Sequence, residues 1–307
     1  MYHRFNENKY PSTNIQMDIF IKQMKLINDS NYKFLYPSNF EKVYYQAKKQ
    51  KKILITIDDA FESFYDNAWP YLKKNKIPFI LFVSTEPVGK NGYMNWDQIK
   101  EIEKESFVEI GHHSHSHEYL IDKSDSKFVL DIEKANKLFL DNIGYVPTLF
   151  SYPFGEYSEF MRKYISKNFK FAFGQHSGVI DLNKEKFQLP RFPINENYGK
   201  LERFQKIINT FPLQYKKLSP IEKKIGKKNN PPSFKVEFFK DQKNIQNITC
   251  FSNEGDIWKK SNVIFNQNTL TIKFREPFKP RRGRINCSLN DNGKWRWFGT
   301  QFVVKEN

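Results

Sequence analysis

Short apolar runs that end in reactive residue types constrain the fold of this chain more than any other feature of its sequence. The runs at residues 52–57, 107–110 and 148–152 each lead directly into a motif of Asp, of His, or of Pro and Gly. Helix-length segments separate the runs, and strands that alternate with helices are typical of a parallel sheet, open or barrel-like. In such folds the chemistry lies at the carboxyl ends of the strands, so we expect the three motifs to share one edge of the sheet.

The same alternation continues over residues 1–213 and predicts an α/β domain there. The expected strands are 52–57, 79–83, 107–110, 148–152 and 169–173, and the expected helices are 64–75, 96–104 and 124–142. Over residues 234–307 short alternating runs recur, with turn residues between them and no helix-length pattern, which predicts a small all-β, sandwich-like domain. Residues 214–233 are rich in Pro, Gly, Asn and Lys, and we expect them to form a linker.

Composition excludes several classes of protein. With 39% hydrophobic residues the chain can bury a core, which excludes a wholly disordered protein. No apolar run approaches the roughly 20 residues that cross a bilayer, and no apolar signal-peptide core follows Met1. The two cysteines, Cys250 and Cys287, exclude a disulfide-rich scaffold and a zinc cluster of four cysteines. The sequence leaves open whether these two cysteines are bonded to each other.

The positive charge is concentrated in the last third of the chain. Residues 216–307 hold 20 basic and 8 acidic residues, so they carry +12 of the formal net charge of +16. An excess of this size indicates an anionic partner or surface. A genome rich in A and T would also favour lysine codons, but that explanation suits Arg281, Arg282 and Arg284 less well. These arginines are candidates for gripping phosphate or carboxylate groups of an anionic glycan.

A histidine cluster follows the run at 107–110. The segment Gly111–His117 holds four of the six histidines, and histidines at this density serve metal binding or proton transfer more often than packing. His113 and His117 are four residues apart, which places two imidazoles on one face of a helical turn. The alternative is an exposed histidine tract that binds nothing specific.

Two adjacent acids, Asp58 and Asp59, end the run at 52–57. Carboxylates at the end of an apolar strand are costly without a cation or hydrogen-bond donors. Successive side chains of a strand point in opposite directions, so one Asp can bind a metal while its neighbour holds a water beside it. The alternative is a pair of helix N-caps. One Asp and two His with a coordination position open to water form a hydrolytic metal site.

These motifs resemble those of the polysaccharide deacetylases, carbohydrate esterase family 4. The resemblance rests on Thr56–Asp59, Ile110–His117 and Tyr152–Gly155, supported by Asn95–Asp97, and it covers roughly residues 1–195. It implies a deformed, often incomplete (β/α) barrel for the first domain. It also implies a metal-dependent hydrolase that removes N-acetyl groups from N-acetylhexosamine residues of a polysaccharide.

The resemblance assigns a role to each matching residue. Asp58 matches the general base, and Asp59, His113 and His117 match the ligands of one divalent metal ion, expected to be Zn²⁺ with Co²⁺ or Ni²⁺ as alternatives. The loop that lines the acetyl pocket, where a backbone N–H helps to bind the oxyanion, is matched by Tyr152, Pro153, Phe154 and Gly155. His112 and His115 stand at positions outside the metal-ligand set.

Two departures from the family pattern need substitutes. The arginine that tethers the base is absent at about Ser151, and Arg191 is our candidate, the alternative being a surface arginine in a loop bracketed by prolines. The general acid is expected to be His3, because Met1–Phe5 resembles the N-terminal Tyr-His strand of the permuted poly-N-acetylglucosamine deacetylase-like branch. His176 is the rival. A residue so near a terminus normally frays, so we expect either a longer natural chain or an N-terminus pinned in the sheet.

The second domain leaves a different function open. Trp258, Trp295, Trp297 and Phe298 can stack on sugars, which suggests carbohydrate binding, although core packing is the alternative. The competing hypothesis for the whole chain is a non-catalytic glycan- or nucleic-acid-binding protein that uses this basic, aromatic domain. Asp58 beside a complete metal set argues against it, because a binding protein has no need of the base. We therefore expect a polysaccharide partner and no nucleic acid. The resembling branch favours a periplasmic or extracellular location, with the cytoplasm as the alternative.

Overall fold

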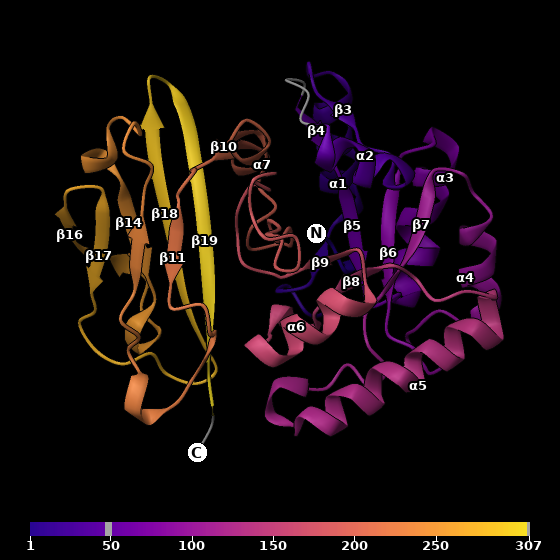
Figure 1. Cartoon of the computed structure of the whole chain (residues 1–307). Helices are drawn as coiled ribbons and strands as arrows, with labels where there is room; N and C mark the ends of the chain where they lie inside the picture. Colours follow the sequence, from indigo (N-terminus) through magenta and orange to yellow (C-terminus); the bar gives the residue numbers. More distant parts are fainter. Residues whose placement is uncertain (47–50, 306–307) are drawn as a thin grey trace.

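The computed structural model describes residues 1–46 and 51–305. Figure 1 shows two parts side by side: a sheet flanked by helices, and a pair of stacked sheets built from the C-terminal third of the chain. The first part is a curled parallel half-barrel and the second is made mostly of antiparallel strands. The expected fold class, a deformed (β/α) barrel followed by a sandwich-like β domain, is therefore confirmed.

The barrel sheet has the strand order β5-β6-β7-β8-β9, and every neighbouring pair is parallel. Its strands are β5 Ile55–Asp58, β6 Phe79–Val83, β7 Val108–His112, β8 Leu149–Ser151 and β9 Phe171–Phe173. Each of β5, β6, β8 and β9 is buried along its whole length, as expected for parallel strands covered on both faces. All five expected strands are present, with ends shifted by a few residues.

Helices cover this sheet, and their ends follow from local sequence. The helices are α1 Met17–Asn28, α2 Phe40–Tyr45, α3 Trp69–Asn75, α4 Trp96–Glu103, α5 Asp125–Ile143, α6 Glu159–Asn168 and α7 Leu201–Ile208. Asn95 and Gln98 form a capping box at the start of α4, and Ser124 caps α5, which ends at left-handed Gly144. In the described part of the chain, none of the helices combines the length and apolar character required to span a bilayer.

The N-terminus extends the sheet beyond β5. Tyr2 forms a parallel bridge with Ile57, its N–H donates to the Thr56 carbonyl at 2.9 Å, and its own carbonyl accepts the Asp58 N–H at 2.9 Å. The short strands β1 Arg4–Phe5 and β2 Asn14–Ile15 then pair with each other. The first residues are thus pinned in the sheet, which is one of the two expected outcomes.

A loop joins the two edges of the curled sheet. Leu189 pairs with Phe173 of β9 at the far edge, and the chain then runs back toward the N-terminus. There the Met1 amino group donates to the Phe192 carbonyl at 3.1 Å, and the Ile194 N–H donates to the Met1 carbonyl at 3.0 Å. Residues 189–194 therefore bridge the opening of the half-barrel.

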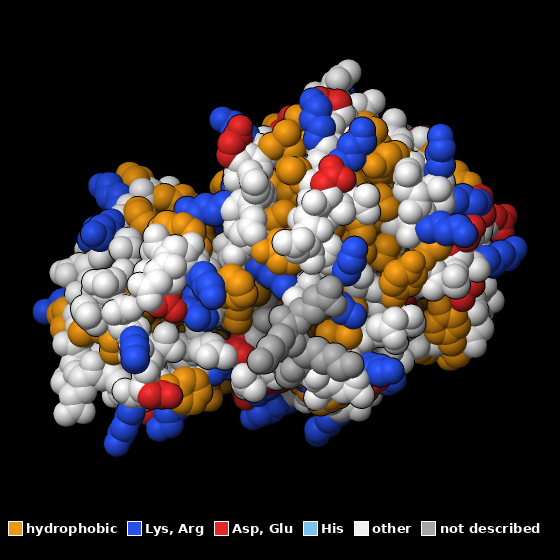
Figure 2. Space-filling model, turned by 90° about the horizontal axis from the view of Figure 1, so that it is seen from above, with side chains coloured by type: hydrophobic (Ala, Val, Ile, Leu, Met, Phe, Trp, Pro, Cys, Tyr) orange, Lys and Arg blue, Asp and Glu red, His pale blue; other side chains and the backbone are white. Residues whose placement is uncertain are grey.

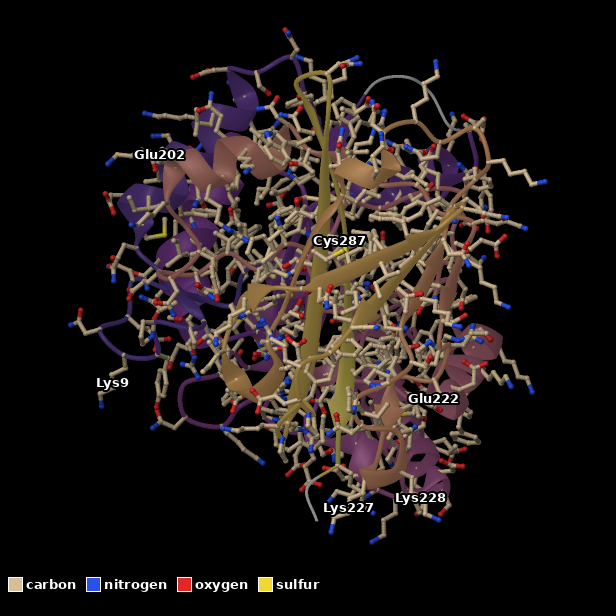
Figure 3. The ribbon with its side chains drawn as sticks, turned by 90° about the vertical axis from the view of Figure 1, so that its left-hand side faces the viewer. Lys9, Glu202, Glu222, Lys227, Lys228 and Cys287 are labelled. Atoms are coloured by element: carbon tan, nitrogen blue, oxygen red, sulfur yellow. A yellow bond between two sulfur atoms is a disulfide. The ribbon has the colours of Figure 1, made fainter. Side chains whose placement is uncertain are left out.

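The second part consists of two sheets around one apolar core. One sheet has the order β10-β19-β18-β14-β15 with β12 also on β19, and the other has the order β11-β13-β17-β16. The main strands are β13 Lys235–Glu237, β14 Thr249–Ser252, β15 Lys259–Lys260, β16 Asn262–Asn266, β17 Thr269–Lys273, β18 Arg282–Asp291 and β19 Lys294–Val304. Cys250 and Cys287 face each other on β14 and β18 and form a disulfide inside the sandwich (Figure 3).

The expected linker does more than connect. Three short strands, β10 Phe211–Pro212, β11 Lys217–Ser219 and β12 Lys224–Ile225, pair with strands of the C-terminal sheets. Two of them lie within residues 214–233, so this segment contributes to the β domain. The sequence of this segment does not reveal these strands, because β12 pairs with the end of β19, which is distant in sequence. The boundaries 1–213 and 234–307 stay predictions.

The strand β19 lies against the barrel domain (Figure 1). A Cβ at Gly299 would approach the Ser177 carbonyl oxygen to 2.2 Å, so only glycine allows the two backbones to meet this closely. Nearby, Trp297 packs edge-on against Phe192 at 5.9 Å between ring centroids. This aromatic residue, a candidate for sugar stacking, thus contributes to the interface between the domains.

The basic residues are not gathered in one place on the face seen in Figure 2, where Lys and Arg side chains are spread over both domains. Lys227 and Lys228 project from one end of the β domain (Figure 3). The arginines expected to grip a glycan are occupied instead: Arg281 and Arg282 form ion pairs with Glu156 of the barrel domain. That expectation is therefore wrong for these two arginines, because their charge is neutralised within the chain.

Candidate active site

The three sequence motifs meet at the carboxyl edge of the barrel sheet. Asp58 is the last residue of β5, His112 the last of β7 and Ser151 the last of β8. The register brings these strand ends level, since His112 pairs with both Val83 and Phe150. The residues that follow each strand therefore project into one shared space, as the alternation of strands and helices predicts.

Asp59, His113 and His117 form a compact group whose ligand atoms all lie within 4.8 Å of one another. Asp59 Oδ1 is 3.0 Å from His117 Nε2 and 3.3 Å from His113 Nε2. Asp59 and His113 are buried, and in the described residues neither Asp59 Oδ1 nor His113 Nε2 has a hydrogen-bond partner. Buried polar atoms that converge without partners fit a cation, and one Asp with two His is a donor set suited to a divalent metal.

The orientation of His113 is fixed from behind. Its Nδ1 lies 2.6 Å from the Ser151 carbonyl oxygen, and a carbonyl can only accept, so Nδ1 carries the proton. The lone pair of Nε2 therefore points toward Asp59. Metal-binding histidines commonly have this kind of support, which sets both the tautomer and the ring orientation.

The backbone around this group adopts an unusual conformation. Asp59, Ala60, Ser114 and His117 all have positive φ, at 78°, 52°, 69° and 51°. A non-glycine residue in the left-handed region costs on the order of 1–3 kcal/mol, and such residues persist where the surrounding structure enforces them. Strain concentrated on two of the three candidate ligands and their neighbours is characteristic of a functional site.

Asp58 and Arg191 form a buried bidentate ion pair. Arg191 Nη1 donates to Asp58 Oδ1 at 2.7 Å, and Nη2 donates to Asp58 Oδ2 at 2.8 Å. The remaining donors of the guanidinium bind Thr56 Oγ1, Ser151 Oγ and the Gly174 carbonyl oxygen. Arg191 thus contacts the carboxylate as expected of a tether, and Ser151 accepts a hydrogen bond from it.

This contact determines the charge of Asp58. Burial alone would raise the pKa of the carboxyl, but Arg191, with smaller effects from His113 and His3, outweighs it and lowers the pKa. Asp58 is therefore an anion at neutral pH. Both of its oxygens contact Arg191, so its position differs from that of Asp59, whose Oδ1 faces the two histidines.

The two histidines that are candidates for the general acid, His3 and His176, have different surroundings. His3 is half-buried, and burial lowers its pKa while the nearby carboxylates of Asp59 and Asp58 oppose this effect. His176 lines a cavity of about 350 Å³ between the domains, together with Lys223, and burial lowers its pKa to about 3. The carboxylates of Asp59 and Asp58 thus act on His3, whereas the charges that act on His176 are those of Lys223 and Arg191.

The loop from Tyr152 to Gly155 contributes unequally. Tyr152 and Pro153 are buried, and the Tyr152 hydroxyl donates to the Phe187 carbonyl at 3.1 Å. Phe154 has φ 57°, and its ring centroid lies 4.7 Å from that of His117. Gly155 has φ 66°, and a Cβ there would lie 2.4 Å from the Gln175 nitrogen. Phe154 is therefore the side chain of this loop that reaches the candidate ligands.

The other two histidines of the cluster lie outside the group. His112 is buried against Phe139, Phe150 and Phe169, and burial lowers its pKa to about 3. His115 is half-buried and its Nδ1 lies 2.9 Å from the Thr85 hydroxyl. Both placements agree with leaving these residues out of the ligand set.

Sequence reasoning missed Asp131 of α5. Its two carboxylate oxygens accept hydrogen bonds from the backbone N–H groups of His115 at 2.8 Å and Ser116 at 3.0 Å, so it holds the turn between His113 and His117. The signal was present in the helix pattern. Asp131 lies on the buried stripe formed by Phe128 and Ala135, where an acid needs buried donors.

The sequence motifs and the fold are shared with known deacetylases. Residues 45–170 match the sequence profile of the polysaccharide deacetylase family. A poly-beta-1,6-N-acetyl-D-glucosamine N-deacetylase of Staphylococcus aureus is 28% identical to this chain over an alignment of 195 residues that covers 58% of this chain and 67% of that protein.

Two solved structures have a similar barrel fold. The deacetylase PplD of Streptococcus pyogenes, solved in complex with acetate, is 20% identical with a TM-score of 0.61, and covers 67% of this chain and 95% of its own. IcaB from Ammonifex degensii is 22% identical with a TM-score of 0.59, and covers 67% of this chain and 94% of its own. At these identities the similarity shows the fold.

Arg191→Met is expected to lower the free energy of unfolding by about 3–5 kcal/mol, because it leaves the Asp58 charge buried without its partner. The double variant Asp58→Asn with Arg191→Met should be more stable than Arg191→Met alone, since the unpaired charge of Asp58 is removed as well. Urea unfolding of the metal-free proteins measures both effects. A single variant as stable as the parent would contradict a buried ion pair.

Asp131→Ala is expected to weaken metal binding about tenfold to a hundredfold, because the turn between His113 and His117 loses both of its carboxylate contacts. Competition with a chelator of known affinity measures this. Asp141→Ala, which removes an exposed acid from the same helix, is the control and should leave affinity unchanged. Equal affinities in the two variants would show that Asp131 has no part in holding the site.

Proposed function

We propose, since this chain belongs to the polysaccharide deacetylase family, that it is a metal-dependent hydrolase which removes N-acetyl groups from N-acetylhexosamine residues of a polysaccharide. The observation that supports this most is that the end of β5 carries two adjacent aspartates with different surroundings, one suited to bind a metal and one suited to act as a base. Asp59 faces His113 and His117, while the neighbouring Asp58 is held by Arg191.

Asp59, His113 and His117 would hold the metal. Their ligand atoms converge, and two of them, Asp59 Oδ1 and His113 Nε2, are buried without a hydrogen-bond partner among the described residues. Nitrogen and carboxylate ligands suit Zn²⁺, with Co²⁺ or Ni²⁺ as alternatives that this donor set also accepts. When bound, a divalent ion supplies Lewis-acid polarisation of the acetyl carbonyl and makes a nearby water more acidic. Three protein ligands leave coordination positions for substrate and water.

Asp58 is proposed as the general base. Arg191 keeps it ionised, so it can accept a proton from the attacking water at neutral pH. The ion pair also fixes the direction of the carboxylate, because Arg191 binds both oxygens from one side. A base that is already held in position needs little rearrangement before it takes the proton from the water.

His3 is proposed as the general acid. Two observations support this proposal: Tyr2, the residue before it, pairs with Ile57 near the end of β5, and the charges of Asp59 and Asp58 act on the His3 imidazole. In the protonated form it would give a proton to the amine nitrogen of the departing sugar, so that acetate and a free amino sugar are produced. Phe154, packed on His117, would form one wall of the pocket for the acetyl group.

The proposed substrate is a poly-N-acetylglucosamine type of polymer. The S. aureus relative carries the name of a poly-beta-1,6-N-acetyl-D-glucosamine N-deacetylase. The aromatic side chain of Phe154 packs on His117, so that it would border a sugar bound at the candidate ligands.

Metal removal is expected to abolish acetate release from N-acetylglucosamine oligomers, and added Zn²⁺ or Co²⁺ should restore it. Asp58→Asn should keep the metal and lower kcat by about 10²–10⁴-fold, because the base is lost while the ligands remain. Coupled acetate detection and metal analysis measure these effects. Full activity in Asp58→Asn would remove the base from the mechanism.

His3→Gln is expected to lower kcat by about 10²-fold or more while leaving metal content unchanged. His176→Gln is the matched control, since that histidine lies in the cavity between the domains, and it should retain near-parental kcat. The same acetate assay compares them. The opposite ranking would transfer the acid role to His176.

A further inference from the structure

The β domain reaches the barrel domain at the loop beside the candidate active site. Arg281 Nε donates to both carboxylate oxygens of Glu156 at 2.9 Å, and Arg282 Nε donates to Glu156 Oε1 at 2.7 Å. Arg281 also pairs with Asp122. Glu156 is buried and directly follows the Phe154–Gly155 turn. Two arginines of one domain thus fix the acid that ends the active-site loop of the other.

A second contact from the β domain holds the loop backbone. Gln301 of β19 donates its side-chain N–H to the Phe154 carbonyl at 3.3 Å. Its amide is oriented by Arg284 of β18, whose Nε donates to Gln301 Oε1 at 3.1 Å. Gln301 is buried, so this contact is sheltered from water. Adjacent strands of the β domain therefore hold Phe154 by its carbonyl and Glu156 by its carboxylate.

The loop adopts a conformation that requires support. Phe154 is a bulky residue with φ 57° and ψ 7°, which is unfavourable for a side chain of this type. In this conformation its ring packs on His117, at 4.7 Å, and on Tyr119, at 4.2 Å. The Arg281 guanidinium in turn lies over the Tyr119 ring, 3.8 Å from its centroid. Contacts thus run without a break from the β domain to a candidate metal ligand.

We propose that Arg282 and Gln301 are positioning residues: through them the β domain holds Phe154 against His117 and shapes the acetyl pocket. The inference rests on the proposed deacetylation, and extends it by making the β domain part of the active-site architecture. Another contact attaches the domains at a different place, the edge-on packing of Trp297 on Phe192. Arg282 and Gln301 are therefore not needed merely to keep the domains together.

The test uses the full chain with Arg282→Met and Gln301→Leu, and Arg282→Lys as the conservative variant. Arg275→Gln is the control, because Arg275 pairs with buried Glu254 inside the β domain, and its other hydrogen bonds go to the backbone carbonyls of Ser252 and Lys260 in the same domain. Two measurements are made on each folded, zinc-loaded protein. One is kcat and KM for acetate release from N-acetylglucosamine oligomers, and the other is amide hydrogen exchange of peptides that cover residues 152–157.

Both loop variants should show faster exchange at residues 152–157 and a kcat/KM lower by about tenfold to a hundredfold, because the pocket is misplaced while metal and base remain. Arg282→Lys should recover part of the loss, since it keeps the charge. Arg275→Gln should leave both quantities within about twofold of the parent, even if its melting temperature falls.

Unchanged kcat/KM in Arg282→Met and Gln301→Leu would overturn the inference, whether or not exchange becomes faster. Faster exchange and lower kcat/KM in Arg275→Gln as well would also overturn it, since the effect would then belong to general weakening of the β domain. A parent chain that releases no acetate with metal bound would contradict the proposed function instead. In that case hydrogen exchange alone decides whether the β domain holds the loop.

Discussion

The rest of the site depends on the buried ion pair between Arg191 and Asp58. Two buried charges cost several kcal/mol unless good geometry and further hydrogen bonds compensate for their lost hydration. Here the guanidinium binds both carboxylate oxygens and uses its other donors on Thr56, Ser151 and Gly174. Asp58 ends β5 at one edge of the sheet, whereas Arg191 follows Leu189, which pairs at the other edge. The ion pair can therefore form only when the sheet is curled.

The segment that bridges the half-barrel, residues 189–194, also positions the N-terminal strand. The chain that carries Arg191 continues to Phe192 and Ile194, whose backbones bind Met1 and so hold the N-terminal strand beside β5. That strand delivers His3. The candidate metal ligands come from the turns after β5 and β7. The Ser151 carbonyl binds the His113 ring, and Asp131 binds the backbone of His115 and Ser116 in the turn between His113 and His117. Adjacent aspartates thus acquire different surroundings, one held by a guanidinium and the other facing two imidazoles.

Features with a local signal could be predicted from the sequence. The buried strands, the capped helices and the grouping of Asp59, His113 and His117 follow from apolar runs and from motifs at their ends. Features that depend on distant partners could not. The strand β12 is concealed in a Lys- and Pro-rich segment because its partner is β19. The pairing of Arg281 and Arg282 with Glu156 is likewise a tertiary contact, so their charge suggested an external ligand.

Zinc K-edge X-ray absorption of the zinc-loaded protein, compared with its Asp58→Asn variant, tests the central claim that one aspartate binds metal while its neighbour stays outside as the base. The account predicts two imidazole nitrogens at about 2.0–2.1 Å together with oxygen ligands, and an identical spectrum for Asp58→Asn. Fewer than two imidazoles, or a ligand shell that changes when Asp58 is replaced, would contradict it.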